Sequence, residues 1–236
     1  MDRVTRKELK TDRFAVEVEH TVEYVSEHRR QLIVYGGIAV VVIVVALAIV
    51  GYTRRQHAIR QATLQEAISI QQAAIGPAPS PLIKSFNTKA EKDQEAEKAF
   101  RQVIEKHPGS EEASYAAYML GNIAMDQGKV AEAEKRYKEV AESGHDNYSS
   151  LAKLSLAEMY DAQGKNAEAE KLLRELINKP TALVSKEQAT ITLARVLADS
   201  KPEEARKLIE PLRTSDRDAI SRTALTLSGQ LSATAK

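Results

Sequence analysis

The side chains that usually carry chemistry are sparse and scattered along this chain. There is no cysteine, which excludes disulfides, thiolate nucleophiles and thiolate metal sites. No histidine stands three or four residues from another, the spacing that would put two on one helix face, so a metal site built from histidines is not expected. The five histidines are His20, His28, His57, His107 and His145.

Paired carboxylates are the remaining candidates for acid–base chemistry. Glu111 and Glu112 form one pair, and Glu203 and Glu204 form another. Both pairs stand at predicted helix starts, where the helix dipole stabilises negative charge, so capping explains them better than catalysis. The sequence has no GxSxG, P-loop, HExxH or dinucleotide-binding motif. We therefore expect no enzyme activity, no catalytic, metal-binding or cofactor-binding residues, and no small-molecule substrate.

An apolar run at residues 32–52 is the element relative to which the others must be placed. Its 21 residues, LIVYGGIAVVVIVVALAIVGY, contain no charge and no proline. A bilayer core about 30 Å thick requires about 20 apolar residues in a helix, so the run predicts one transmembrane helix. The alternative is a buried helix of a soluble domain, but the rest of the chain offers no comparably apolar partner. A cleaved signal peptide would have a shorter apolar region, which favours an uncleaved signal anchor.

Charges around the apolar run predict its orientation. Residues 1–31 form a charged tail with seven Lys and Arg, whereas three follow in the 30 residues after the run. The arginines closest to the run, two before it and three after it, slightly favour the opposite orientation. Because positive charge in short segments favours the cytoplasm and long domains translocate largely regardless of charge, we expect a cytoplasmic N-terminus and an external C-terminal domain.

Beyond the anchor, residues 53–75 keep a helical apolar period, so the membrane helix is expected to continue to the proline-rich loop at 76–92. The net charge of the chain is +1, without the surplus of Lys and Arg that phosphate recognition requires. We therefore expect no nucleic-acid partner. The lipid bilayer, contacted through residues 32–52, is the first predicted partner.

An internal repeat is the most specific signal outside the apolar run. DQGKVAEAEK at residues 126–135 and AQGKNAEAEK at 162–171 agree at eight of ten positions, with an offset of 36 residues. Each unit is predicted to be two helices joined at the glycine, which supplies the left-handed residue that ends a helix. The second helices are expected to bury one apolar face each: Val130, Ala133, Tyr137 and Val140 in the first unit, and Ala169, Leu172, Leu173 and Leu176 in the next.

A period near 34 residues with Leu, Gly or Ala, Ala and an aromatic at fixed positions defines the tetratricopeptide repeat, which these units resemble. Ala96, Phe100 and Pro108 show the same spacing in an earlier second helix, with Ser110 as the N-cap of the helix that follows. A later unit is more degenerate: Ser185 and Gln188 form a capping-box pattern at its start, and Leu193 takes the place of the repeat leucine. The predicted fold class is therefore all-α, with a single N-terminal transmembrane helix and a tetratricopeptide-like α-solenoid of helix-turn-helix repeats.

The repeats are expected to occupy residues 93–236 and to end in a capping helix near 216–232, because units of this kind bury their apolar faces only against neighbours. The whole arrangement resembles the ancillary subunit family of the bacterial Sec translocon. Three short segments carry this resemblance besides the architecture: SLAEMY at 155–160, ITLARVLADS at 191–200 and TLSGQL at 226–231.

The resemblance implies a single-pass protein of the bacterial inner membrane with a periplasmic repeat domain. Its implied partners are translocon subunits, periplasmic chaperones and unfolded client chains, and the family has no catalytic residues to carry over. The alternative from another class is a self-associating membrane scaffold for envelope assembly or cell division.

Candidate contacts for a bound chain are expected on the inner face of the solenoid, which first helices line. We place Leu120, Leu156 and Leu193 at the same position of successive repeats. In that alignment the candidate residues of each first helix point toward the inner face. Tyrosines are favoured there because an aromatic ring with a polar tip can bind peptide without requiring one sequence; packing on the neighbouring repeat is an equally weighted alternative. The candidates are Tyr115, Tyr118, Asn122, Met125, Leu154, Glu158 and Arg195.

Overall fold

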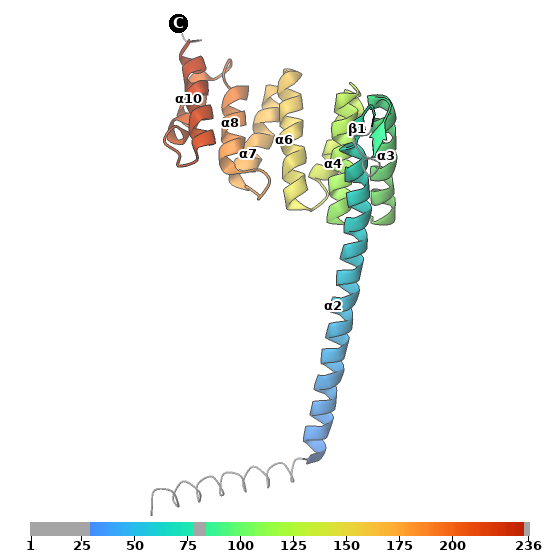
Figure 1. The fold of residues 1–236 in the computed structure, drawn as a ribbon. Coiled ribbons are helices and arrows are strands. Elements are labelled where there is room, and N and C mark those ends of the chain that lie inside the picture. Colours follow the sequence, from blue (N-terminus) through green and yellow to red (C-terminus); the bar gives the residue numbers. More distant parts are fainter. Residues whose placement is uncertain (1–28, 78–83, 234–236) are drawn as a thin grey trace, which may run out of the picture. The chain divides into compact units, whose positions relative to one another are not determined.

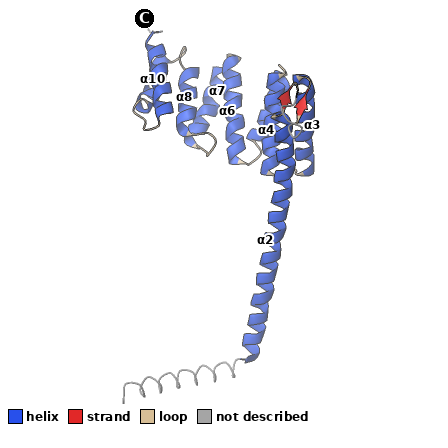
Figure 2. Cartoon of the chain, in the orientation of Figure 1, coloured by secondary structure: helices blue, strands red, loops and turns tan. Residues whose placement is uncertain are grey.

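The structure is a computed structural model that describes residues 29–77 and 84–233. The chain falls into two compact units, Met1–Ala58 and Ile59–Lys236, which are treated separately below. Nearly all of the charged tail expected at 1–31 lies outside the described residues, as does the middle of the proline-rich loop. Helices make up most of the described chain (Figure 2).

One long helix, α2 (Arg29–Gln71), covers the apolar run and continues past it without a break. Between Ile33 and Tyr52 its large hydrophobic side chains are 45% to 67% exposed, on every face of the helix. A core helix of a soluble domain would bury at least one face. Among the described residues this is the one helix long and apolar enough to cross a membrane.

The last turns of α2 belong to the second unit and are packed. Ala67 is fully buried and Ile70 nearly so, in a cluster with Phe100, Leu120 and Ile123 from the next two helices. The side chain of His107 also reaches Thr63, with 3.3 Å between Nε2 and Oγ1. The end of α2 therefore supplies the first helix of an N-terminal repeat whose second helix alone was visible in the sequence.

Two short strands, which the sequence did not predict, close the loop after α2. The strands β1 (Ala74–Ile75) and β2 (Ser85–Phe86) pair in parallel, and the Gly76 amide donates to the Phe86 carbonyl at 2.8 Å. Gly76 has φ 97°, a conformation that favours glycine. A two-residue strand is too short for alternating polarity to reveal it.

The helix α3 (Lys89–Lys106) begins inside the segment expected to be loop. Thr88 is its N-cap, and its hydroxyl accepts from the Glu91 amide at 3.1 Å. The Glu91 carboxylate in turn accepts from the Asn87 amide at 3.1 Å. This T-x-x-E pattern was the overlooked sequence signal for the helix start.

The remaining helices alternate in antiparallel pairs along the solenoid (Figure 1). First helices are α4, α6 and α8; second helices are α5, α7 and α9; α10 closes the array. Their bounds are α4 (Glu111–Asp126), α5 (Val130–Ala141), α6 (Asp146–Ala162), α7 (Asn166–Asn178), α8 (Lys186–Val196), α9 (Pro202–Ile209), the 3₁₀ turn η1 (Glu210–Leu212) and α10 (Asp218–Ala233).

Helix ends follow the local sequence. Gly128 and Gly164 both have φ 72° at the turns that join first to second helices, as the repeated QGK predicted. Ser110 caps α4 by accepting from the Ala113 amide at 3.1 Å, and Ser185 caps α8 by accepting from the Gln188 amide at 3.2 Å. Each hydroxyl satisfies an amide that has no partner within the helix.

Small residues let neighbouring helices approach. A Cβ added to Gly121 would lie 2.6 Å from Cε1 of Tyr137, so only glycine fits beneath that ring. The other core residues of the second helices lie as predicted, except that Val130 is 40% exposed and Leu172 is only partly buried. Val130 is the first residue of α5, so it precedes the turn at which that helix reaches the core. The alanines that start each buried stripe are Ala96, Ala133, Ala169 and Ala205, all at most 1% exposed.

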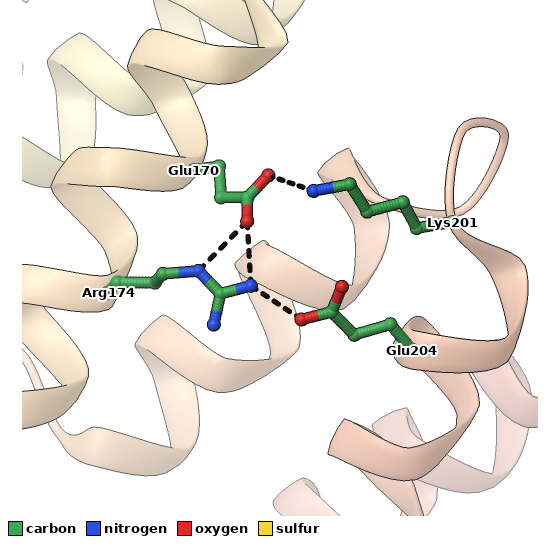
Figure 3. Close-up of polar contacts among 4 residues, drawn as sticks. All are labelled: Glu170, Arg174, Lys201 and Glu204. Carbon is green, nitrogen blue, oxygen red and sulfur yellow. Dashed lines mark hydrogen bonds and ion pairs between the residues drawn. The ribbon is translucent and has the colours of Figure 1, made fainter.

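In α3, α5 and α7 the glutamate after the buried alanine contacts the following repeat. Glu170 of α7 accepts from Lys201, at the start of α9, at 2.9 Å, and from Arg174 at 2.6 Å (Figure 3). Arg174 also donates to Glu204 of α9. The same positions in α3 hold Glu97 and Arg101, which contact Gln127 and Glu132 around the start of α5. The repeated acidic and basic residues thus join one repeat to the next.

This pattern ends at the last second helix. Arg206 follows the buried Ala205 where the earlier second helices have glutamate. Its Nη2 donates to the carbonyl of Leu231 in the last turns of α10, at 2.7 Å. A cation at that end of the helix opposes the negative end of the helix dipole. The closing helix is therefore held by a change of charge at the repeated position.

Glu170→Gln is expected to destabilise the second unit by less than about 1 kcal/mol at neutral pH, because its partners are largely exposed. Hydrogen bonds from Lys201 and Arg174 lower the pKa of the Glu170 carboxyl. The stabilisation is therefore complete above the ordinary carboxyl pKa and is lost as pH falls through the lowered one. Urea unfolding at neutral and strongly acidic pH measures the difference. Glu168→Gln, which removes the same charge from α7, should have little effect at either pH.

Candidate protein-binding site

One repeat position forms a polar row across the three first helices. Asn122, Glu158 and Arg195 each stand two residues after the buried leucines of α4, α6 and α8. Asn122 is half-buried, and Glu158 and Arg195 are exposed. Successive first helices contact one another, and equivalent repeat positions place these three residues on one face, here called the first-helix face.

Asn122 is fixed by a neighbour from the second helix of its own repeat. Its Oδ1 accepts from the Tyr137 hydroxyl at 2.7 Å. The ring of Tyr137 lies 5.7 Å from that of Tyr118, whose hydroxyl is 3.3 Å from Oγ of Ser155 on α6. Among the described residues, the acceptor for the amide nitrogen of Asn122 is the weakly accepting Sδ of Met119, at 3.7 Å. An oriented amide donor is thus available on this face for a stronger acceptor.

A second group of aromatic residues joins the beginnings of α4 and α6. Tyr115 contacts Tyr148 edge to face, with centroids 5.5 Å apart, and contacts Phe100 of α3 at 6.5 Å. Burial raises the pKa of the Tyr115 hydroxyl and of the Tyr148 hydroxyl. Both side chains are partly exposed, so they pack against a neighbour and still present surface.

The carboxyl of Glu158 on the first-helix face is affected by the protein around it. Its side chain is exposed, yet desolvation by surrounding protein raises the pKa of its carboxyl, with Arg195 acting in the opposite direction. An exposed group is desolvated when protein atoms surround it on several sides. Burial also raises the pKa of the Tyr137 hydroxyl, as do Tyr118 and the carboxylates of Asp126 and Glu158.

The structure thus brings Tyr115, Tyr118, Asn122, Glu158 and Arg195 to this face. Met125 is 37% exposed, one turn beyond Asn122 on α4. Leu154 is 6% exposed and belongs to the core, so it does not line the first-helix face.

Sequence reasoning missed four residues that complete this face: Asp126, Tyr137, Tyr148 and Ser155. Ser155 stands three residues before Glu158, so the helical period alone would place it beside that residue. Tyr137 was assigned to the core and lies there at 3% exposed, but its hydroxyl reaches Asn122. Only the packing of α5 against α4 shows that a core residue orients a surface one.

Comparison with known families decides the class of the protein. The tetratricopeptide repeat-like domain matches residues 30–181, which is more than half of the chain. The chain belongs to this family. Tetratricopeptide repeat-like domains are protein-interaction scaffolds, and this member is an interaction adaptor of that class, with protein partners. The match begins at the second residue of α2 and therefore includes the apolar run.

Solved structures show the same solenoid. TPR-like repeats from a putative kinesin light chain of Podosopora anserina share 16% identity, with a TM-score of 0.52 over 72% of this chain and 84% of theirs. PilF of Pseudomonas aeruginosa shares 17% identity, with a TM-score of 0.50 over 72% of this chain and 75% of PilF. At these identities the likeness concerns the fold alone. No curated protein sequence matches the chain.

Proposed function

We propose that this tetratricopeptide repeat-like protein is a membrane-anchored adaptor that binds polypeptide on its first-helix face. In this proposal residues 32–52 cross the bacterial inner membrane once, with the N-terminus cytoplasmic and the repeats periplasmic. The partners are translocon subunits, periplasmic chaperones and newly translocated chains. The face of α4, α6 and α8, with an oriented amide and partly exposed tyrosines, is the observation that carries the proposal.

The chemistry of the first-helix face suits an extended chain. A bound peptide presents backbone carbonyls, which the Asn122 amide can bind in place of the weak thioether contact at 3.7 Å. Tyr115, Tyr118 and Tyr148 offer ring surface with polar tips, which suits varied side chains. No group at this face demands one particular side chain, as expected for an adaptor with several clients.

The exposed apolar part of α2 supports the membrane anchor. Tyr35 and Tyr52 are 67% and 66% exposed near its two ends. At a rise of 1.5 Å per residue they lie about 26 Å apart along the axis, close to the hydrocarbon thickness of about 30 Å. Tyrosine is enriched at both membrane–water interfaces, because its ring prefers the apolar side and its hydroxyl the wet side. In this proposal Tyr35 and Tyr52 lie at the two membrane–water interfaces and anchor the helix there.

Photo-crosslinking in intact membranes tests the adaptor proposal. A benzophenone amino acid replaces Met125 or Arg195 on the first-helix face, and Lys171 on α7 serves as the control; all three are exposed. We expect translocon subunits, chaperones or translocating chains to be captured from positions 125 and 195, at least several-fold more than from 171. Equal capture from all three positions would show that the first-helix face is not the binding site.

A self-associating scaffold for envelope assembly or division is the competing function. The same experiment separates the two, because a scaffold would yield crosslinks only between its own copies. Small residues of the apolar run do not fall at the GxxxG spacing that favours dimerisation in lipid. The adaptor therefore remains the function that the observations favour.

A further inference from the structure

The part of α2 that follows the apolar run carries positive charge without a matching negative charge. Arg54 and Arg55 come directly after Tyr52 and Thr53, and the helix has no Asp or Glu before Glu66. Both arginine side chains are exposed. Within the part of the chain that the structure describes, neither takes part in an ion pair or a side-chain hydrogen bond.

Neighbouring polar groups of the helix already have partners elsewhere. The Thr53 hydroxyl donates to the Val50 carbonyl at 3.0 Å, so it is turned back onto the helix. Arg60 pairs with Glu112 of α4, with 3.6 Å between Nε and Oε2. Arg54 and Arg55 therefore differ from the next arginine of α2, whose charge is balanced within the protein.

The position of the two arginines along the helix places them beside lipid phosphates. At a rise of 1.5 Å per residue, they begin about 3 and 4.5 Å beyond Tyr52 along the axis. A bilayer about 40–45 Å thick with a hydrocarbon core of about 30 Å leaves a headgroup layer of roughly 5–8 Å on each side. With Tyr52 at the membrane–water interface, both guanidinium groups lie within reach of that layer.

The chemistry of the two side chains specifies which lipids suit them. A guanidinium group presents a planar fork of donors that matches two oxygens of one phosphate. Adjacent residues of a helix point about 100° apart, so Arg54 and Arg55 face different lipids. A zwitterionic headgroup balances its own phosphate with an ammonium group, whereas an anionic headgroup keeps its negative charge. Two arginines without a carboxylate partner therefore favour anionic lipids.

We propose that Arg54 and Arg55 form an anionic-phospholipid contact at the C-terminal end of the membrane helix, each binding the phosphate of a separate lipid. This inference rests on the membrane anchor of the proposed function and names the lipids that surround it. The other end of the helix is different, because Glu27 precedes Arg29 and Arg30 in the sequence. The lipid preference is therefore assigned to positions 54 and 55.

Native mass spectrometry of the full-length protein, released from nanodiscs, tests this contact. The nanodiscs contain equal amounts of phosphatidylglycerol and phosphatidylcholine with the same acyl chains, and the lipids that stay bound are identified by mass. We expect phosphatidylglycerol to outnumber phosphatidylcholine about fivefold among them, the preference that one arginine near a membrane surface contributes. The variant Arg54→Gln with Arg55→Gln should retain the two lipids equally.

The matched control is Lys135→Gln with Lys171→Gln, which removes the same charge from exposed positions of α5 and α7. It should behave as the wild type, and an equal loss of preference in this control would overturn the inference in favour of net charge alone. Equal retention of both lipids by the wild type would also overturn it and leave the membrane anchor standing. Failure of the wild type to enter the nanodiscs would overturn the anchor and the lipid contact together.

Discussion

Replacing Phe100 with alanine is expected to destabilise the second unit by about 3–5 kcal/mol. Phe100 is fully buried, and its ring contacts Tyr115 of α4 edge to face at 6.5 Å. It belongs to the same cluster as Ala67 and Ile70 from the end of α2. The ring of Phe100 is enclosed by α4 and by the end of α2. Its removal leaves a cavity, because these two helices cannot both move in to fill the space.

Urea unfolding of a fragment covering residues 59–236, followed by circular dichroism, measures this effect. Phe100→Leu is the matched control, because Leu173 occupies the equivalent position of a later second helix. It should cost less than about 1.5 kcal/mol. Hydrogen exchange adds a local readout: amides near Ile70 should exchange faster in the alanine variant. Similar losses in both variants, without faster exchange there, would contradict the packing of α2 in the first repeat.

Two arginines in the apolar run, Val42→Arg with Val45→Arg, are expected to abolish membrane insertion. Both valines are exposed, at 60% and 51%, so the substitutions disturb no protein core. Each arginine near the centre of a transmembrane helix costs about 2.5–3.5 kcal/mol on insertion scales. Together they remove most of the free energy that inserts a single helix. Carbonate extraction at alkaline pH measures the result, as transfer of the protein to the soluble fraction.

The control is Val42→Leu with Val45→Leu, which keeps the run apolar and should stay in the membrane pellet. Retention of the arginine variant there would contradict the assignment of residues 32–52 as the anchor. The same membranes report orientation. Protease added outside the inner membrane should digest residues 53–236, and digestion of the N-terminal tail instead would reverse the proposed topology.

Much of the solenoid could be predicted because repetition makes local signals unambiguous. The glycine turns at 128 and 164 and the serine caps at 110 and 185 are local features, so they occur where the sequence indicated. The loop boundary was less accurate, because the Thr88 cap was overlooked among polar residues. Two-residue strands carry no period, and β1 and β2 exist only because their loop brings them together.

By itself, the sequence of this protein determined the long apolar helix, the repeat family and the repeat positions that line one face. Each follows from periodicity, which depends only on residue spacing along a helix. The tertiary structure alone decided how the end of α2 packs in the first repeat, that Glu170 joins α7 to α9, and that Leu154 is buried while Glu158 is exposed. These depend on which helices approach one another, and residue spacing within one helix does not contain that information.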